Sequence, residues 1–451
     1  MNEEFGRALP ALRTPPPGPE SLRLAAELRR YESPNVTFLS DDFPVFWAEA
    51  KGANVRDVDG NVYVDMTAAF AVAAAGHGHP RIVSAVQRQA ERLLHGMGDV
   101  HPPAVKAELL KKLADVTPDG LRRSILANSG AEAVEAALKT VVLATGRPKV
   151  LAFHGAYHGL TLGALSVSGR DDFRRPFTAQ LADLAVFAPF PIPSAGKGDD
   201  PLRAPSALES VERVLNGAVG RDVGAILVEP VQGRGGDIVP PAGWLPGLRR
   251  ICDDRGLLLV LDEIYTGFGR TGRWFACEHW GVVPDLLVVG KALTGGLPFA
   301  ACVGTDAVME SWPVSAGEAL HTSTFLGHPL ACAAALASLE VIQEERLVER
   351  AASEGAYLQE RLAATLGDDR RVRQVRGLGM MIGVEFVDPV TERPDPDLVG
   401  RVVVESLRRG FIVLGGGVDS NVLSLSPPLN IERMQVDAFV TMLGAVMHAL
   451  R

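Results

Sequence analysis

Short apolar runs recur along the middle of the chain, and each is followed by a stretch with helical periodicity. Four of them, at residues 149–153, 224–229, 257–262 and 286–291, show no alternation of apolar and polar positions. Continuous runs of this kind are typical of strands buried on both faces, and their spacing leaves room for one crossover helix each. The pattern therefore predicts an α/β fold with a mostly parallel central sheet and flanking helices.

The two ends of the chain have different patterns. Residues 48–65 alternate apolar and polar positions around the turn Asp59-Gly60-Asn61, which is typical of a β-hairpin. Beyond about residue 335, long amphipathic helices are predicted, with strands at 379–386 and 422–425. These segments predict a smaller α+β lobe formed by the N- and C-terminal segments.

These patterns divide the chain into four parts. We expect a leader with one helix at 1–40, a β segment at 41–80 that joins the small lobe, a large domain at 81–335 and a C-terminal small domain at 336–451. The length of 451 residues is enough for two or three lobes with a substantial buried interior.

Composition and charge narrow the class of protein. The chain has 47% hydrophobic and 22% charged residues, which excludes a disordered, collagenous or coiled-coil protein. The net charge of −9 and the lack of a basic run argue against nucleic acid or an anionic membrane as the main partner. Since no apolar stretch is long enough for a secretory signal or a membrane span, we expect a cytoplasmic protein.

Several motifs that suggest other chemistry lack the context that they need. None of the four cysteines belongs to a C-x-x-C pair, so we expect reduced core thiols. The segments 77–79 and 277–279 contain histidines without companions at ligand spacing, so no metal is expected. Residues 267–272 match the G-x-G-x-x-G pattern of dinucleotide-binding folds, but Arg273-Trp274 follows where a helix should begin.

Lysine is scarce in the second half of the chain, and Lys291 is the only lysine among residues 198–451. It stands at the carboxyl end of a predicted buried strand, where an unpaired ammonium group is costly. An amine with a tunable pKa forms a Schiff base with an aldehyde, whereas a guanidinium does not. Lys291 is therefore the first candidate for a covalent catalyst; the alternative is a strand-end lysine that extends its amine into solvent.

Asp262 ends the neighbouring predicted strand. Ligands of open α/β sheets bind outside the carboxyl ends of the strands, so Asp262 and Lys291 are expected to face one ligand. A buried carboxylate needs a cationic partner, and a protonated pyridine nitrogen is one. A helix N-cap or a purely structural aspartate is the alternative.

Two further segments suggest a phosphate site and a stacking surface. Ser129 and Glu132 fit a Ser-x-x-Glu capping box, and free N–H groups at Gly130 and Ala131 would cradle an anion. Most boxes of this kind merely begin a helix. Tyr157 follows a predicted strand and offers a ring that stacks on a flat heterocycle, although loop aromatics more often only pack.

From about Pro44 to the C-terminus, the chain resembles the class III (ω-amino) aminotransferases, which are fold type I enzymes that use pyridoxal 5′-phosphate. The resemblance implies that fold, that cofactor, a large domain that binds it, and a homodimer with shared active sites. The motifs that carry it are Asp57-Val58-Asp59-Gly60-Asn61, Gly76-His77-Gly78-His79-Pro80, Asn128-Ser129-Gly130-Ala131-Glu132, Tyr157-His158-Gly159, Glu229-Pro230-Val231-Gln232-Gly233, Asp262-Glu263-Ile264, Lys291 and Ser323-Thr324-Phe325.

The resemblance also implies roles for individual residues. Lys291 would hold the cofactor as a Schiff base and carry protons, and Asp262 would pair with the pyridine nitrogen. Tyr157 and Ile264 would sandwich the ring, and Thr324 of the partner subunit would reach the phosphate. The other cofactor-binding residues that it implies are Ser129, Gly130, Ala131, His158, Glu229 and Tyr265.

This chain departs from the family pattern at three positions that bear on substrate choice. Tyr265 replaces the usual glutamine near the cofactor's phenolic oxygen, and a tyrosine still donates one hydrogen bond there. Ser424 matches the position of an arginine that clamps the carboxylate of 2-oxoglutarate and that Glu229 masks when the donor lacks that carboxylate. Arg234 replaces an acid, and we hypothesise that it supplies the missing carboxylate contact; alternatively, it faces solvent or the dimer partner. Phe70 belongs to a segment expected to line the pocket with Ser424.

The predicted function is a ping-pong transfer of an amino group between a primary amine and a 2-oxo acid or aldehyde. The amine is an amino acid, a diamine or an ω-amino compound. The alternative is another reaction of the same cofactor, namely epimerisation, aminomutation or decarboxylation, since the protein selects the bond that reacts. A catalytically silent binding module is a third hypothesis, and the joint presence of Lys291, Asp262, Tyr157 and Thr324 argues against it.

Overall fold

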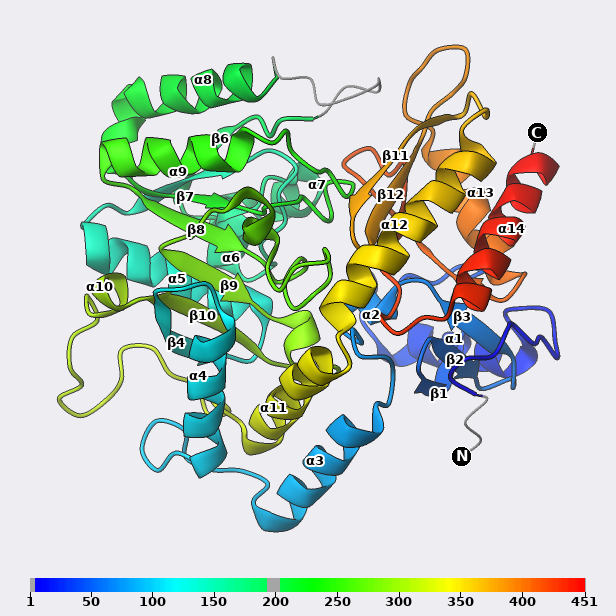
Figure 1. Ribbon diagram of the computed structural model, residues 1–451, viewed down its shortest axis with the longest axis horizontal. Helices are drawn as coiled ribbons and strands as arrows, with labels where there is room; N and C mark the ends of the chain where they lie inside the picture. Colours follow the sequence, from blue (N-terminus) through cyan, green and yellow to red (C-terminus); the bar gives the residue numbers. More distant parts are fainter. Residues whose placement is uncertain (1–4, 193–202, 451) are drawn as a thin grey trace.

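A seven-stranded sheet forms the centre of the larger part of the molecule, on the left of Figure 1. The computed structural model describes residues 5–192 and 203–450. All neighbouring strands run parallel except β10, which is antiparallel to both of its neighbours, so the predicted mostly parallel sheet is confirmed. The strand order is β4 (Leu121–Ala127), β10 (Ala300–Thr305), β9 (Leu286–Val289), β8 (Leu258–Asp262), β7 (Val223–Val228), β5 (Lys149–Phe153) and β6 (Ala185–Ala188).

The continuous apolar runs are explained by helices on both faces of this sheet. In β7 every residue is buried, and successive side chains enter different hydrophobic clusters. Ile226 packs in the cluster that contains Trp244 of α9, whereas Leu227 packs in the cluster that contains Val134 of α5. Full burial of each such side chain contributes roughly 1.5–3 kcal/mol. The helices of this part are α3 (Pro80–Arg92), α4 (Ala104–Val116), α5 (Gly130–Thr145), α6 (Leu162–Val167), α7 (Asp171–Arg174), α8 (Arg203–Asn216), α9 (Trp244–Arg255), α10 (Asp306–Met309) and α11 (Pro329–Glu344), with 3-10 turns η1 (Arg175–Gln180), η2 (Ala218–Asp222), η3 (Ala276–Trp280) and η4 (Lys291–Leu293).

The two ends of the chain meet in the smaller lobe, on the right of Figure 1. The predicted hairpin around Asp59-Gly60-Asn61 pairs β2 with β3, and the C-terminal strand β13 joins β3 in parallel through Phe411 and Val64. This shared sheet is the predicted α+β lobe formed by both ends. The elements are β1 (Trp47–Lys51), β2 (Asn54–Asp57), β3 (Val62–Asp65) and β13 (Phe411–Ile412) in one sheet, β11 (Val372–Leu378), β12 (Met381–Phe386), β15 (Val422–Leu425) and β14 (Leu414–Gly416) in another, and α1 (Pro19–Tyr31), α2 (Ala68–Ala71), α12 (Leu347–Leu366), α13 (Pro396–Leu407) and α14 (Arg433–Ala449).

Two local features differ from the sequence prediction. The strand expected at 286–291 ends at Val289, because Lys291 leaves the extended conformation with a φ of +42° and begins the turn η4. The strand β11 was not predicted, because its residues are mostly only half-buried and lack a clear apolar pattern. The four cysteines are buried free thiols, as predicted.

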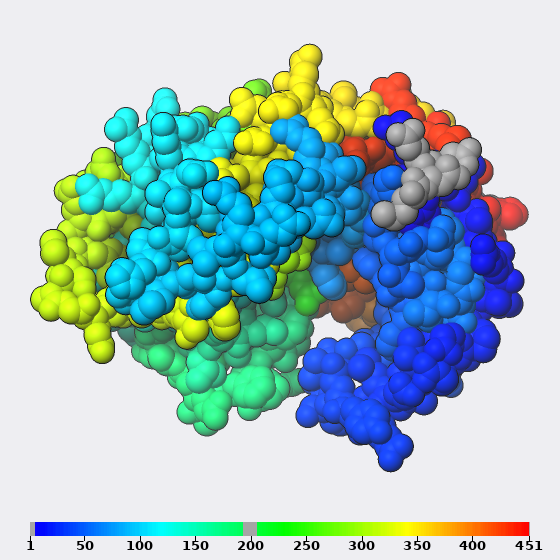
Figure 2. All heavy atoms as spheres, turned by 90° about the horizontal axis from the view of Figure 1, so that it is seen from below, coloured from blue at the N-terminus to red at the C-terminus, as the bar shows by residue number. Residues whose placement is uncertain are grey.

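Within residues 5–192 and 203–450, no helix is long and apolar enough to cross a membrane. The same residues contain no group of three or more histidine, cysteine or acidic side chains placed to hold a metal ion. Seen from below in Figure 2, the surface is hollowed between the blue N-terminal segment and the green segment of the larger part. A cavity between the two lobes is the natural place to examine for chemistry.

Candidate active site

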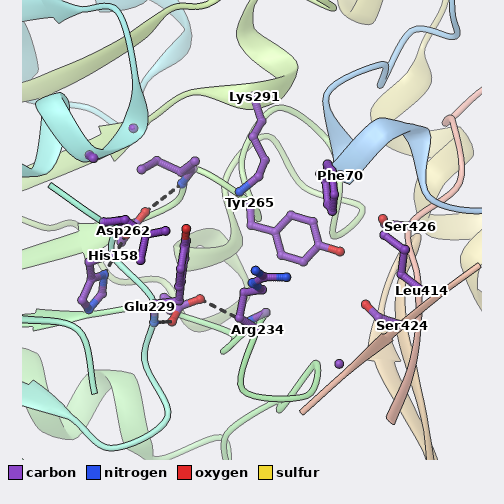
Figure 3. Close-up of a pocket in the computed structure, with 18 of the residues that line it drawn as sticks. Phe70, His158, Glu229, Arg234, Asp262, Tyr265, Lys291, Leu414, Ser424 and Ser426 are labelled. Atoms are coloured by element: carbon purple, nitrogen blue, oxygen red, sulfur yellow. Dashed lines mark hydrogen bonds and ion pairs between the residues drawn. The ribbon is translucent and has the colours of Figure 1, made fainter. Parts of the chain in front are cut away.

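A cavity of about 510 Å³ lies at the carboxyl ends of β7, β8 and β9, where it meets the smaller lobe. This is the edge at which open α/β sheets bind their ligands. Figure 3 shows its side chains converging from both lobes. The lining residues are Thr67, Phe70, Ser129, Gly130, Ala131, Tyr157, His158, Gly159, Leu160, Glu229, Gly233, Arg234, Asp262, Ile264, Tyr265, Lys291, Leu414, Gly415, Gly416, Ser424 and Ser426.

The sequence-predicted residues are brought together here with one exception. Thirteen of the fourteen candidates line the cavity, and Thr324 does not. Thr324 lies in an exposed turn before α11, and the neighbouring Phe325 is 56% exposed. Thr324 is thus the one predicted site residue that the described chain does not bring to the cavity.

Lys291 enters the cavity from the turn η4, two residues after β9 ends. Its Nζ lies 4.9 Å from the centre of the Tyr265 ring. Burial lowers the pKa of Lys291, and the nearby Arg234 lowers it further, although Asp262 and Glu229 oppose the shift. A lowered pKa increases the fraction of neutral amine, which is the form that attacks a carbonyl carbon.

Asp262 is held rigidly at the end of β8. Its Oδ2 accepts a hydrogen bond of 2.8 Å from Nδ1 of His158, and its Oδ1 accepts one of 3.1 Å from the backbone N–H of Ile264. Both side chains are almost completely buried. His158 Nε2 is buried without a hydrogen-bond partner among the described residues. The imidazole therefore serves to orient the carboxylate toward the cavity.

Glu229 follows β7 and is fixed by two backbone donors. The N–H groups of Tyr157 and Gly233 each donate a hydrogen bond of 3.0 Å to its carboxylate. Burial raises the pKa of Glu229 to about 7 and Asp262 adds to the shift, while His158 and the two N–H groups oppose it. Glu229 thus carries only part of a negative charge at neutral pH in this structure.

The first turn of α5 forms the cradle predicted for an anion. Ser129 Oγ accepts from the N–H of Glu132 at 3.2 Å, but the Glu132 carboxylate binds the N–H and side-chain amide of Asn128 instead of closing the expected box on Ser129. The N–H groups of Gly130 and Ala131 have no intrahelical acceptor, because they belong to the first turn. A Cβ at Gly130 would lie 2.7 Å from Cδ1 of Ile264, so a larger residue there would displace the Ile264 side chain, which also lines the cavity.

Phe70 belongs to a strained turn at the opposite side of the cavity. The four consecutive residues 68–71 all have a positive φ, between 46° and 65°, although none is a glycine. The carboxylate of Asp65 holds the turn by accepting hydrogen bonds from the N–H and hydroxyl of Thr67, the N–H of Ala69, and His77. Strain of this kind persists only where the surroundings enforce it, and it is typical of ligand sites.

Arg234 provides the positive charge of the cavity. Its guanidinium lies 5.2 Å from the centre of the Tyr157 ring and 5.8 Å from that of Phe173. Figure 3 shows the side chain rising from the cavity floor toward Tyr265. It is the only arginine among the lining residues that the structure describes. Arg234 is also exposed, so the alternative that it faces solvent or the dimer partner stays open beside the predicted carboxylate contact.

The small lobe contributes residues that the sequence analysis missed, namely Leu414, Gly415, Gly416 and Ser426. Ser426 was predictable from the sequence as a cavity residue, because it lies two residues after Ser424 and side chains two positions apart share one face of a strand. Figure 3 shows the Tyr265 hydroxyl pointing toward these two serines. The side of the cavity away from Asp262 is thus lined by hydroxyl groups.

The geometry agrees with comparisons to known proteins. The family model "Aminotransferase class-III" matches residues 38–447. Acetylornithine aminotransferase of Methanosarcina acetivorans is 39% identical over 89% of this chain and 91% of its own. The alanine/serine racemase of Pyrococcus horikoshii is 34% identical over 94% of this chain and 90% of its own. The crystal structure of an (S)-enantioselective omega-transaminase from Thermomicrobium roseum matches with a TM-score of 0.88 and 29% identity, covering 95% of this chain and 98% of that chain.

A family model that matches nearly the whole chain decides between the predicted reaction classes. Neither the silent binding module nor the oxidoreductase suggested by residues 267–272 agrees with it. Class III aminotransferases use pyridoxal 5′-phosphate and transfer an amino group between a primary amine and an oxo compound. The chain belongs to the class III aminotransferases and is a pyridoxal 5′-phosphate-dependent aminotransferase.

Proposed function

We propose that this aminotransferase holds its cofactor between Lys291 and the start of α5. When bound, pyridoxal 5′-phosphate supplies an electron-withdrawing ring that stabilises negative charge on the substrate carbon. Free N–H groups at Gly130 and Ala131 suit its phosphate, because a helix N-terminus favours an anion. Tyr157 and Ile264 line the same cavity, and their side chains would contact the two faces of the cofactor ring.

The roles of the polar residues follow from their contacts. Asp262, oriented by His158, would place negative charge beside the pyridine nitrogen and keep that nitrogen protonated. Lys291 would take the proton from the substrate carbon and return it, because burial lowers the pKa of its amine and so makes the neutral form more accessible. The single observation that carries this assignment is the placement of Lys291 and Asp262 on adjacent strand ends around one cavity.

We further propose that Arg234 binds the carboxylate of the oxo-acid acceptor. It is the cavity's only described arginine, it points inward, and Ser424 stands where the family arginine is expected. A guanidinium binds a carboxylate through two parallel hydrogen bonds. The KM for 2-oxoglutarate should rise about 10–100-fold in Arg234→Ala and recover in part in Arg234→Lys, with little change in kcat.

The matched control is Arg273→Ala, since Arg273 stands in the loop after the neighbouring strand β8 but does not line the cavity. An unchanged KM for the acceptor in Arg234→Ala would refute the role. A loss of kcat with every substrate would instead assign Arg234 to the cofactor.

We propose a homodimer in which the partner's Thr324 completes the phosphate site. Thr324 stands in an exposed turn beside the exposed ring of Phe325, which packs 5.4 Å from His95. Exposed apolar residues gather in the same region, including Leu94, Met97 and Val100. Light scattering should give twice the chain mass, and Thr324→Ala should weaken cofactor binding without changing that mass. A monomer that binds the cofactor at full strength would refute this proposal.

A second reaction, amino-acid racemisation, is favoured by the similarity to the Pyrococcus horikoshii racemase. The two are separated by a single-turnover experiment without acceptor. Transamination converts the bound cofactor to its amine form and releases one equivalent of carbonyl product. Racemisation inverts the amino acid and leaves the cofactor spectrum unchanged. We expect the first result.

A further inference from the structure

The buried carboxylate of Asp237 has no role in the function derived above. It lies in the loop after β7 that also carries Arg234, has a φ of +51°, and has no exposed surface. Neither of its carboxylate oxygens has a well-formed hydrogen bond among the described residues. A buried carboxylate without donors is unfavourable, and such groups are found where a cation or a ligand compensates them.

The nearest cation does not satisfy Asp237. The guanidinium of Arg376 donates two hydrogen bonds, of 3.0 and 2.7 Å, to the carbonyl of Gly236, and its remaining nitrogen binds Glu385. Burial raises the pKa of Asp237 to about 7; the Ser424 hydroxyl and Arg376 oppose the rise and Glu229 adds to it. An additional cation would therefore stabilise the ionised carboxylate.

Asp237 lies directly behind the hydroxyl-lined side of the cavity. Gly383 pairs with Ser424 across β12 and β15, and a Cβ at Gly383 would lie 3.1 Å from the Cβ of Asp237. The Ser424 hydroxyl is close enough to oppose the rise in the pKa of Asp237 that burial causes. Burial also raises the pKa of Tyr265, Asp237 adds to that rise, and the hydroxyl groups of Ser426 and Ser424 oppose it. Asp237, Ser424 and Tyr265 therefore form one connected group that reaches from the protein interior to the cavity.

The negative charge of Asp237 favours one orientation of the neighbouring Ser424 hydroxyl. A serine that directs its proton toward a buried carboxylate presents its oxygen lone pairs to the cavity. The Ser424 side then accepts hydrogen bonds, whereas the Arg234 side only donates them. An ammonium group has three donors and no acceptor, so it fits the first side, while a carboxylate there would be repelled.

We propose that Ser424, Tyr265 and Ser426, backed by Asp237, bind a second ammonium group of the amine donor. The preferred donor class is then a primary aliphatic diamine or a diamino compound, with one amine at Lys291 and the other at Ser424. The acceptor would use the opposite side of the cavity, with its carboxylate on Arg234. This inference rests on the proposed function, since the first amine must react at Lys291.

Three four-carbon amines that differ only at the far end test the proposal on the holoenzyme. They are 1,4-diaminobutane, butylamine and 4-aminobutyrate, which carry a cation, a methyl group and an anion there. Conversion of the cofactor is followed by its absorption spectrum in the absence of acceptor. The diamine should have a kcat/KM at least about ten-fold above that of butylamine, mostly through KM, as one charge-assisted interaction provides.

Two substitutions connect the preference to the named residues. Asp237→Asn keeps the shape of the side chain and should reduce the ratio of kcat/KM for the diamine to that for butylamine to about two-fold or less, because the charge that orients Ser424 is lost. Ser424→Ala should have the same effect without altering the interior, so it decides the matter if Asp237→Asn does not fold. The matched control is Ser406→Ala, a buried serine of α13 away from the cavity.

The outcomes separate this proposal from the function on which it rests. If all three amines convert the cofactor at similar rates, transamination stands and the preference for a diamine is refuted. The preference is also refuted if it survives in both Asp237→Asn and Ser424→Ala. If none of the three amines converts the cofactor, the preference for a diamine is refuted, and a parallel reaction with an α-amino acid such as alanine then decides whether the proposed function itself stands.

Discussion

The two ends of the cavity are constructed differently. At the cofactor end, Glu229, Asp262 and Lys291 follow β7, β8 and β9, and the two carboxylates are held by backbone N–H groups or a buried imidazole. At the substrate end, Phe70 and Arg234 stand on a left-handed turn and a loop. A buried parallel sheet fixes the groups that perform chemistry, whereas irregular segments supply the contacts that choose a substrate.

This difference predicts two kinds of mutant. Substitutions at the cofactor end should lower kcat with every substrate, because each substrate reacts at the same atoms. Substitutions at the substrate end should change KM and the ranking of substrates. The difference between the two ends would be refuted if a substitution at the cofactor end lowered kcat with only some substrates. It would also be refuted if a substitution at the substrate end lowered kcat equally with all of them.

The largest effect is expected for Lys291→Ala. The substitution removes the amine that holds the cofactor and carries the proton, so kcat should fall about 10⁴-fold or more with every donor. The measurement is steady-state kinetics, combined with mass mapping of the cofactor adduct after borohydride reduction. Lys139→Ala on the exposed side of α5 is the control and should have wild-type rates. An adduct on any other residue would contradict the assignment.

Asp262→Asn should have the next largest effect. The amide keeps the shape of the carboxylate but removes the negative charge that faces the ring nitrogen, so kcat should fall about 10²–10³-fold. The fold reduction should be equal for a small and a large donor. Steady-state kinetics with two donors of different size measure this reduction. A reduction of kcat with only one donor would mean that Asp262 acts on substrate binding and not on the cofactor.

The cofactor end was predictable from sequence because its signals are local. The continuous apolar runs predicted β7, β8 and β9, and a strand end is itself the expected position for a ligand. The isolated Lys291 stands out in a chain that otherwise uses arginine. Only the position of Lys291 differed from the prediction, since Lys291 lies in the turn after β9 and not on the strand.

The substrate end was only partly predictable because its contacts link distant segments. Asp65 holds a turn whose left-handed backbone no apolar pattern signals, and Ala-Ala-Phe-Ala is an ordinary helical sequence by propensity. Asp237 lies beside Ser424, nearly two hundred positions later, only because β12 and β15 bring them together. Arg234 was identified through a departure from a family pattern, and its inward orientation needed the structure.

Asp65→Asn tests the substrate end with a smaller effect. The amide accepts weaker hydrogen bonds from Thr67 and Ala69, so the turn that carries Phe70 should loosen. KM for the donor should rise roughly ten-fold, with kcat nearly unchanged and the ranking of donors altered. Asp57→Asn is the matched control, because Asp57 is an equally buried aspartate of the same sheet whose hydrogen bonds go to Asn61 and Tyr63 and not to the turn that carries Phe70. Equal changes in both variants would mean that Asp65 acts only through stability.

The smallest effect concerns the pH dependence of stability, to which the buried carboxylate of Glu229 contributes. Burial raises the pKa of Glu229 from 4.5 to about 7, so the folded state binds more protons than the unfolded state between these values. Stability from this group is therefore complete below about pH 4.5 and is lost as pH rises through about 7.

Thermal unfolding of the cofactor-free enzyme at pH 5 and pH 8 measures this loss. Glu229→Gln does not titrate, so the difference in Tm between the two pH values should shrink by about 2 °C. Asp237 is raised to about 7 by the same cause, so part of the difference should remain in Glu229→Gln and disappear when Asp237→Asn is added. If the two substitutions together leave the pH dependence of Tm unchanged, neither Glu229 nor Asp237 is buried as described. If Glu229→Gln removes all of it, Asp237 is already compensated in the absence of substrate, and a second ammonium group has no unpaired charge to bind.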